Sequence, residues 1–290
     1  MARLVLLVVC GAFALPATAL AKPRWQMLPL PPPMPAPASS GFVAVGDANI
    51  YYGVFGTGEP VILLHGGMGN GDHYAHQVPA LVSRFQVVAI DSRGHGRSTL
   101  GTAKLSYGQM ATDVIAVMDK LGIERAAIVG WSDGGEIGLH LAIHHPQRVA
   151  KLFVFGANYN AAGSKPRGRK PSLTFSAYTA KCKSDHIRLS NTPTAFARMV
   201  TAMLPVWRKP GGFTKDQLRG ITAPTMVADG EHDEIIVLDQ IKEMAQLIPS
   251  GQLAIFDDTS HFALWQDPAA FNRVLLAFLT GKPAPAGPKT

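Results

Sequence analysis

Ser132 lies in the part of the sequence that is best suited to nucleophilic chemistry. Residues 126–135 read AAIVGWSDGG, so an apolar run typical of a strand meets the pattern G-x-S-x-G, and a helical pattern follows at once. A nucleophile at such a sharp turn needs neighbours without bulk, because a β-carbon at Gly130 or Gly134 would crowd the backbone. The following helix presents unpaired N–H groups where negative charge develops. The pattern therefore predicts Ser132 as a nucleophile.

A serine hydroxyl attacks a carbonyl efficiently only when a base removes its proton. Of the ten histidines, His261 alone lies just after the last predicted strand and before the final predicted helix. Asp233 lies in the loop after the strand predicted at residues 225–228, and the chain order serine, acid, histidine suits a catalytic triad. We therefore predict His261 as the base and Asp233 as the acid that orients it. Other carboxylates in the same loops are alternative acids: Asp229, Glu231, Asp257 and Asp258.

An oxyanion that forms on the substrate needs two preorganised N–H donors. The backbone N–H of Asp133, directly after the nucleophile, is expected to be one of them. The second should come from residues 65–69, which read HGGMG and follow the strand predicted at residues 61–64. Small residues in this loop let the backbone turn N–H groups inward. We predict Gly67 as the second donor, with Met68 as the alternative.

We assign structural rather than catalytic roles to the remaining reactive side chains. We interpret His65 and the charged loop at residues 91–98 as braces of the site. The histidine pairs at positions 73/76 and 144/145 lack the carboxylate or cysteine that would complete a set of metal ligands, so we predict neither a metal nor another cofactor. Cys182 is the single cysteine after residue 21, which excludes a disulfide within that part of the chain.

Short apolar runs alternate with longer amphipathic segments, as in a largely parallel sheet with helices on both faces. An opening hairpin is predicted at residues 42–45 and 50–55. Nearly continuous apolar runs predict further strands that are buried on both faces, at residues 61–64, 87–90, 126–129, 152–155, 225–228 and 253–256. Helical spacing marks residues 107–121, 136–145, 238–247 and 269–279. The sequence therefore predicts an α/β fold with about eight strands.

The stretch at residues 158–213 interrupts this alternation. Weakly helical, proline-interrupted sequence stands where a single helix would return directly to the sheet. We interpret this stretch as a small helical lid inserted into the body. We predict that the substrate pocket is lined from the lid by Phe175, Tyr178, Met203 and Trp207, and from the body by Met68, Trp131 and Phe262. The alternative is that the lid residues only pack the lid onto the body.

Both ends of the chain are predicted to lie outside the hydrolytic core, which spans residues 41–157 and 214–280. Residues 1–21 combine a charged start, a short apolar stretch and a small-residue cleavage site, which is typical of a signal peptide. Residues 22–40 contain a dense proline run that favours an extended linker, and residues 281–290 suit a disordered tail. We therefore expect an exported protein, periplasmic or secreted, without stable membrane insertion after cleavage. An uncleaved membrane anchor is the alternative.

The charge of the chain limits its partners. The 290 residues carry a formal net charge of +7. Part of the excess lies in a basic loop at residues 165–170 that has no interleaved aromatic residues, so we expect no specific binding of nucleic acid. The expected partner is a small-molecule acyl substrate, and the sequence leaves the oligomeric state open.

Taken in order, these motifs resemble the α/β-hydrolase superfamily over about residues 42–279. The motif GWSDGG is most similar to biphenyl-hydrolase-like and valacyclovir-hydrolase-like esterases, which cleave esters and related acyl bonds without a cofactor. Ser132 argues against the related dehalogenases and epoxide hydrolases, which use an aspartate there. Met68 departs from the common HGGPG form, which argues against a peptidase. The segments that carry the resemblance are HGG at 65–67, DSRGHGRS at 91–98, GWSDGG at 130–135, GEHD at 230–233 and SHF at 260–262.

The resulting hypothesis is two-step acyl transfer. Ser132 attacks a carbonyl while His261 takes its proton, the N–H groups of Gly67 and Asp133 hold the oxyanion, and water later releases the acyl group. Three alternatives use the same fold: hydrolysis of a carbon–carbon bond in a diketone, acyl transfer or peracid formation, and ligand binding with residual hydrolysis.

Overall fold

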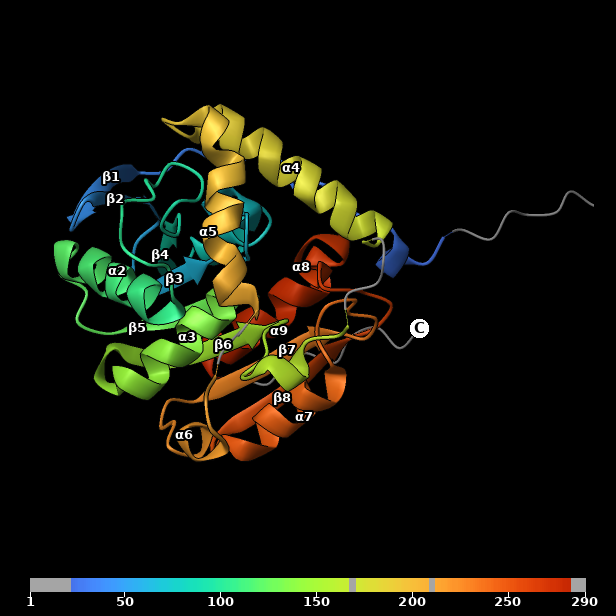
Figure 1. Ribbon diagram of the computed structural model, residues 1–290. Coiled ribbons are helices and arrows are strands. Elements are labelled where there is room, and N and C mark those ends of the chain that lie inside the picture. Colours follow the sequence, from blue (N-terminus) through green and yellow to red (C-terminus); the bar gives the residue numbers. More distant parts are fainter. Residues whose placement is uncertain (1–21, 167–170, 209–211, 283–290) are drawn as a thin grey trace, which may run out of the picture.

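An eight-stranded sheet forms the centre of the protein (Figure 1). The computed structural model describes residues 22–166, 171–208 and 212–282. The strand order is β1-β2-β4-β3-β5-β6-β7-β8; β2 runs antiparallel to β1 and β4, and the other neighbours run parallel. The predicted α/β fold and its opening hairpin are confirmed. The strands are β1 (Ser39–Val45), β2 (Ala48–Phe55), β3 (Glu59–Leu64), β4 (Phe85–Ile90), β5 (Ala126–Trp131), β6 (Val149–Phe155), β7 (Thr225–Gly230) and β8 (Gly251–Phe256).

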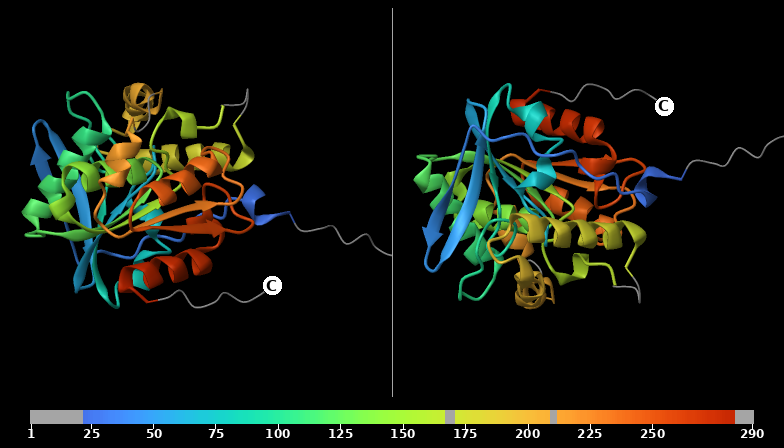
Figure 2. Two further views of the ribbon diagram at one scale, coloured as in Figure 1. Left: turned by 90° about the horizontal axis from the view of Figure 1, so that it is seen from below. Right: turned by 90° about the horizontal axis from the view of Figure 1, so that it is seen from above.

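Helices cover both faces of the sheet. Figure 2 shows α9 on one face and α2 and α3 on the other. Helix α3 packs on β5 and β6, whereas α1 packs on β4 and α9. The α-helices are α1 (Val78–Leu81), α2 (Tyr107–Lys120), α3 (Asp133–His144), α4 (Leu173–Leu189), α5 (Phe196–Arg208), α6 (Lys215–Arg219), α7 (Leu238–Leu247), α8 (Ala263–Gln266) and α9 (Pro268–Thr280). Short 3-10 turns are η1 (Arg24–Gln26), η2 (Gly71–Tyr74), η3 (Pro146–Arg148), η4 (Ala161–Gly163) and η5 (Pro193–Ala195).

Local sequence explains where these elements begin and end. The Ser106 side chain accepts a hydrogen bond from the N–H of Gln109 and so caps α2. Gly281 ends α9 at a φ of 68°, which glycine adopts at little cost. The predicted apolar runs of the central strands are buried, but β8 is an edge strand on which Leu253 is 44% exposed. The prediction that residues 253–256 are buried on both faces is therefore wrong.

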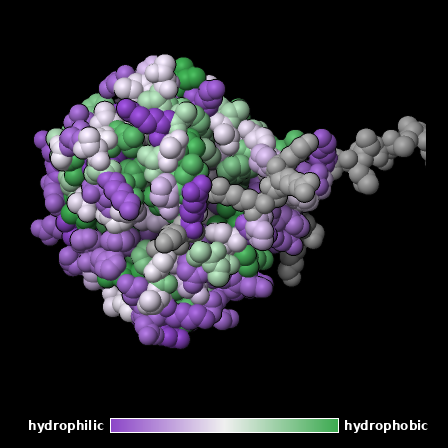
Figure 3. Space-filling view, viewed as in Figure 1, coloured by the Kyte–Doolittle hydropathy of each residue, from purple (hydrophilic) through white to green (hydrophobic). Residues whose placement is uncertain are grey.

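The stretch interpreted as a lid contains α4 and α5, which lie above the end of the sheet at which the parallel strands finish (Figure 1). Hydrophobic and hydrophilic residues are mixed on the face of the molecule that carries both helices (Figure 3). Within the described residues, no helix has the length and apolar character needed to cross a membrane. The predicted signal peptide, part of the basic loop (residues 167–170) and residues 283–290 of the predicted tail lie outside the described chain.

Candidate active site

Ser132 occupies a strained turn between β5 and α3. Its φ of 54° and ψ of −120° are unusual for a residue with a side chain. The Ser132 N–H donates to the Phe155 carbonyl at 2.8 Å, and the Ser132 carbonyl accepts from Gly135 N–H at 2.7 Å. A β-carbon at Gly130 would lie 2.2 Å from the Gly134 oxygen, and one at Gly134 would lie 2.0 Å from the Leu64 oxygen. Only glycines fit at these two positions, so the sequence around Ser132 holds the strained turn in place.

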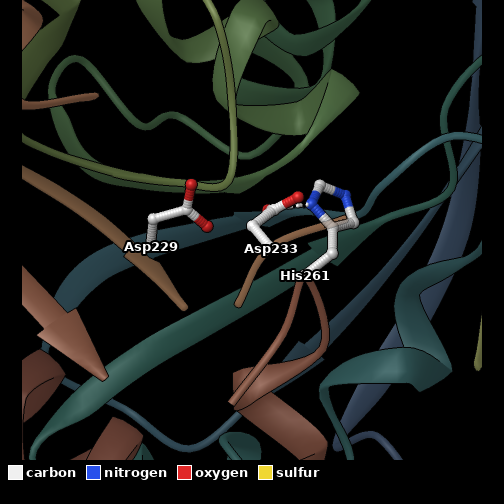
Figure 4. Close-up of side chains that lie close together, drawn as sticks. All are labelled: Asp229, Asp233 and His261. Carbon is white, nitrogen blue, oxygen red and sulfur yellow. Dashed lines mark hydrogen bonds and ion pairs between the residues drawn. The ribbon is translucent and has the colours of Figure 1, made fainter. Parts of the chain in front are cut away.

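His261 and Asp233 form the second part of the site (Figure 4). The Nδ1 atom of His261 lies 2.6 Å from Oδ2 of Asp233, and both side chains are buried. The other oxygen of Asp233 accepts from the N–H groups of Ile235 and Ile236 at 2.6 and 2.7 Å. With Nδ1 donating to the carboxylate, Nε2 of His261 is the nitrogen that can accept a proton. This is the pairing that a general base requires.

In this pair, charge and burial shift the pKa of each residue in opposite directions. Burial by itself would lower the pKa of His261, but the Asp233 carboxylate and its hydrogen bond outweigh burial and raise that pKa. Burial would likewise raise the pKa of Asp233, whereas His261 and the neighbouring donors lower it. Asp233 is therefore ionised near neutral pH and stabilises the imidazolium form of His261.

The His261 ring lies beside the Ser132 turn. Trp131, the residue before the nucleophile, donates from Nε1 to the His261 carbonyl at 3.0 Å. A β-carbon at Gly156, directly after the carbonyl that holds Ser132 N–H, would lie 3.0 Å from the ring. None of the hydrogen bonds formed by the described residues joins Ser132 Oγ to His261. The predicted pair of His261 and Asp233 is thus hydrogen-bonded, whereas Ser132 and His261 are not. Hydrogen bonds between a catalytic serine and its base often tighten only when substrate binds.

Asp229 is a second buried carboxyl group behind Asp233 (Figure 4). The ligand atoms of Asp229, Asp233 and His261 lie within 4.8 Å of one another. Burial and the negative charge of Asp233 raise the pKa of Asp229 well above its usual range, which favours the protonated form of Asp229. In the described chain, the ring of His261 bonds to Asp233 and to none of the four alternative acids. The geometry therefore supports Asp233 as the acid.

The loop at residues 65–69 meets the Ser132 turn from the side of β3. It forms a tight turn in which Gly69 N–H donates to the Gly66 carbonyl and Met68 has a φ of 65°. A β-carbon at Gly67 would lie 2.7 Å from the Asp133 carboxylate, so a larger residue there would have to displace that carboxylate. The structure thus brings together Gly67 and Asp133, the two predicted donors.

His65 braces this loop. Its Nε2 accepts from the Ser92 N–H at 2.9 Å, and its Nδ1 lies 2.8 Å from the Gly66 carbonyl. Burial lowers the pKa of His65 to about 3, so the ring stays neutral in this role. Asp91 holds the neighbouring loops through Gly71 N–H and Arg97. The interpretation of His65 and residues 91–98 as braces is confirmed.

Two lid side chains hydrogen-bond to residues next to Ser132: one to the loop at residues 65–69 and one to Asp133. The Tyr178 hydroxyl, on α4, donates to the Gly67 carbonyl at 2.7 Å. Trp207, on α5, donates from Nε1 to the Asp133 carboxylate at 2.8 Å, and Tyr107 donates to its other oxygen at 3.0 Å. The sequence marks Tyr107 only as the start of a helix, so this contact was missed. Both lid helices are therefore tied to the residues that should stabilise the oxyanion.

Four of the predicted pocket residues, all aromatic, pack against one another: Trp131, Phe175, Tyr178 and Phe262. Ring centroids of Trp131 lie 5.4 Å from Tyr178 and 5.9 Å from Phe262. Met68 and Met203 are buried, whereas Phe175 and Trp207 are partly exposed. Packing of the lid onto the body accounts for these contacts, and contact with a substrate stays a prediction for all seven residues.

Known proteins resemble this chain over most of its length. A family model described as alpha/beta hydrolase fold matches residues 59–188. A putative carbamate hydrolase, RutD, from Caulobacter sp. (strain K31) is 32% identical over 78% of this chain and 92% of the relative. A 2-hydroxy-6-oxononadienedioate/2-hydroxy-6-oxononatrienedioate hydrolase from Cupriavidus pinatubonensis is 28% identical over 83% of this chain and 95% of the relative. The solved structure of Est816, described as an N-acyl homoserine lactone degrading enzyme, is 28% identical, covers 82% of this chain and 100% of its own, and has a TM-score of 0.63.

Proposed function

Since the chain belongs to the α/β-hydrolase family and is a hydrolase, we propose that it cleaves a carboxylic ester or related acyl bond through an acyl-enzyme on Ser132. The observation that carries this proposal is the buried His261–Asp233 pair beside a serine in a strained turn. Relatives named as a carbamate hydrolase and a lactone-degrading enzyme support an acyl substrate.

The proposed reaction has two steps. Nε2 of His261 takes the Ser132 proton as Oγ attacks the carbonyl carbon, and the N–H groups of Gly67 and Asp133 stabilise the oxyanion. His261 then returns the proton to the leaving group, which departs and leaves the acyl group on Ser132. Water, deprotonated by His261, attacks this ester in the second step and releases the acid. Asp233 stabilises the imidazolium in both steps.

The direct test replaces the nucleophile. A Ser132→Ala variant should lose at least a thousandfold in kcat on p-nitrophenyl acetate, because no residual hydroxyl can form the acyl-enzyme. Ser176→Ala is the matched control, since Ser176 lies exposed on α4 and should leave kcat unchanged. An organophosphonate should label Ser132 in the wild-type protein. Full activity in Ser132→Ala would refute the proposal.

A second candidate is hydrolysis of a carbon–carbon bond next to a ketone. The relative that acts on 2-hydroxy-6-oxononadienedioate favours it. A panel of esters, lactones, carbamates and 2-hydroxy-6-oxo acids, compared by kcat/KM, separates the two candidates. A preference for the oxo acids of a hundredfold or more would replace the ester proposal.

We also propose that the protein is exported, because residues 1–21 have the pattern of a signal peptide. Mass spectrometry of the protein recovered from a periplasmic or culture fraction should find Lys22 as the first residue. Recovery of an intact Met1 in the cytoplasm would contradict export.

A further inference from the structure

The segment before β1 is attached to the loops that carry Asp233 and His261. The guanidinium of Arg24 pairs with Asp267 and donates to the Asp257 carbonyl at 3.2 Å, and the Arg24 N–H donates to the Asp258 carboxylate at 3.1 Å. Asp257 and Asp258 lie four and three residues before His261 in the chain. One arginine therefore holds two residues of the loop that leads to the base and, through Asp267, the start of α9.

Two neighbours of Arg24 add contacts on either side of the catalytic pair. The Trp25 ring packs at a tilt against the ring of His232, the residue before Asp233, with the ring centroids 5.0 Å apart. Gln266 donates to the Met27 carbonyl at 2.7 Å, and its side-chain oxygen accepts from the N–H of Ser260 at 2.7 Å. Residues 24–27, which we name the clamp, thus reach the residue before the acid and, through Gln266, the residue before the base.

The loop that the clamp holds contains a strained residue. Asp258 has a φ of 51°, a left-handed conformation that persists only where the surroundings impose it. Its N–H donates to Glu231 at 3.0 Å, and its carboxylate accepts from Arg24 N–H. The Arg24 guanidinium adds an ion pair to the same carboxylate, with Nε 3.5 Å from Oδ2 of Asp258. Arg24→Ala removes this ion pair and leaves the backbone contact in place.

The proline-rich segment has the length needed to put the clamp in this place. The clamp contacts the loop after β8, whereas β1 lies at the opposite edge of the sheet. Crossing seven strand spacings of about 4.8 Å takes about 34 Å. Twelve residues from Met27 to Ser39 span about 37 Å as polyproline but only about 19 Å on average as a flexible chain. Figure 2 shows this segment as the blue trace that crosses the molecule to β1.

Contacts along its course show that the segment lies against the body. Leu28 and Met34 pack on the core, and Ala38 N–H donates to the Val54 carbonyl at 2.8 Å. Residues 31–37 form one wall of a cavity of about 650 Å³ whose other wall includes Arg97 and the Lys181–Arg188 part of α4. Residues 28–38, which we name the strut, therefore do not hang free as a linker would.

We propose that Arg24 and Trp25 are positioning residues that hold the His261 and Asp233 loops in their reactive arrangement, and that the strut sets their place. This inference rests on the proposed function, because it assigns the clamp a role in keeping the acid–base pair beside Ser132.

The test compares Arg24 with an arginine of similar bonding elsewhere. In the full chain, Arg24→Ala should lower kcat on a p-nitrophenyl ester at least fivefold with KM within twofold, and slow organophosphonate labelling of Ser132 in parallel. Arg24→Lys keeps the positive charge but loses the forked guanidinium, so its kcat should lie between those of Arg24→Ala and the wild type. Arg148 lies directly before β6 and bonds the Asp119 carboxylate and the backbone carbonyls of Ile123 and Glu124. Arg148→Ala should therefore lose similar thermal stability without loss of kcat.

Two further measurements distinguish an effect of the clamp from a general loss of stability and from a failure of the proposed chemistry. Deleting Pro32 and Pro33 shortens the strut by about 6 Å and should reproduce the kcat loss of Arg24→Ala, whereas replacing both by alanine should not. Hydrogen exchange of residues 257–262 should rise in Arg24→Ala whether or not Ser132 is the nucleophile. Unchanged exchange, kcat within twofold of wild type, or an equal kcat loss in Arg148→Ala would overturn the inference.

Discussion

The body and the lid support the site in different ways. The body fixes Ser132 through its backbone, because the Phe155 carbonyl holds its N–H and the flanking glycines leave room for no other residue. The lid reaches the site through side chains, with Tyr178 bonded to the Gly67 carbonyl and Trp207 bonded to the Asp133 carboxylate. Backbone support is hard to vary, whereas a single side-chain bond contributes only about 1 kcal/mol. We therefore expect changes in the body to remove catalysis and changes in the lid to tune it.

The two regions also differ in what can move. Trp131 and His261 of the body are 1 and 2% exposed, and the Tyr178 ring of the lid packs on Trp131. Ser132 itself is half-buried, and displacing part of the lid would widen the access to it. Displacing α4 and α5 breaks side-chain contacts with the body, among them those of Tyr178 and Trp207 and those of Asp185 with Asn70 and His73, and leaves the sheet intact. We therefore expect these two helices to move.

The largest expected effect tests the body. Asp233→Asn should lower kcat about ten-thousandfold, because an amide cannot stabilise the imidazolium and can favour the wrong tautomer of His261. Asp229→Asn is the matched control in the same buried pair, and it should cost tenfold or less, since the raised pKa of Asp229 favours its neutral form. Equal losses in the two variants would remove the assignment of Asp233 as the acid.

The pH dependence should report the same pair. His261 acts as a base only when neutral, and its pKa is raised from the usual 6.5 because Asp233 outweighs burial. The kcat/KM of ester hydrolysis should therefore fall about tenfold for each pH unit below a midpoint that lies above 6.5. Glu234 and Asp133 also raise this pKa, so Glu234→Gln should move the midpoint to lower pH by less than one unit. A midpoint well below 6.5 in the wild-type protein would contradict the pairing.

Changes in the lid should be milder. Trp207→Phe and Tyr178→Phe keep the aromatic packing and remove the bonds to Asp133 and Gly67, so each should change kcat/KM about three- to tenfold. Tyr159→Phe is the control, because it removes a comparable hydroxyl bond to Glu243, away from the described Ser132 and His261 contacts. It should leave kcat/KM unchanged. A thousandfold loss in either lid variant would erase the distinction between lid and body.

The parts of the fold and site that follow from the sequence have local signatures. The glycines around Ser132 mark a turn that excludes a β-carbon, and an apolar run such as residues 61–64 gives a buried central strand. The order of Ser132, Asp233 and His261 along the chain then places three loops at one edge of a parallel sheet. These features need no knowledge of distant contacts.

What the sequence did not reveal depends on distant partners. The run at residues 253–256 looks as apolar as a central strand, but its exposure follows from its place at the end of the strand order. The Arg24 contacts join residues more than 230 positions apart, and nothing near Arg24 identifies them. A proline run indicates an extended segment but not the surface along which it lies.

The smallest expected effect concerns Cys182, which lies on α4 and can report movement of the lid. Its thiol is buried, and burial raises its pKa, so iodoacetamide should label it slowly in the folded protein. If α4 moves away from the body when the lid opens, Trp207→Phe and Tyr178→Phe should increase the labelling rate about two- to fivefold, measured by mass spectrometry of the peptide that carries Cys182. Asp233→Asn, a change confined to the body, should leave the rate unchanged. Equal rates in the wild-type and both lid variants would mean that these two bonds do not hold α4 in place, and the lid would then open elsewhere.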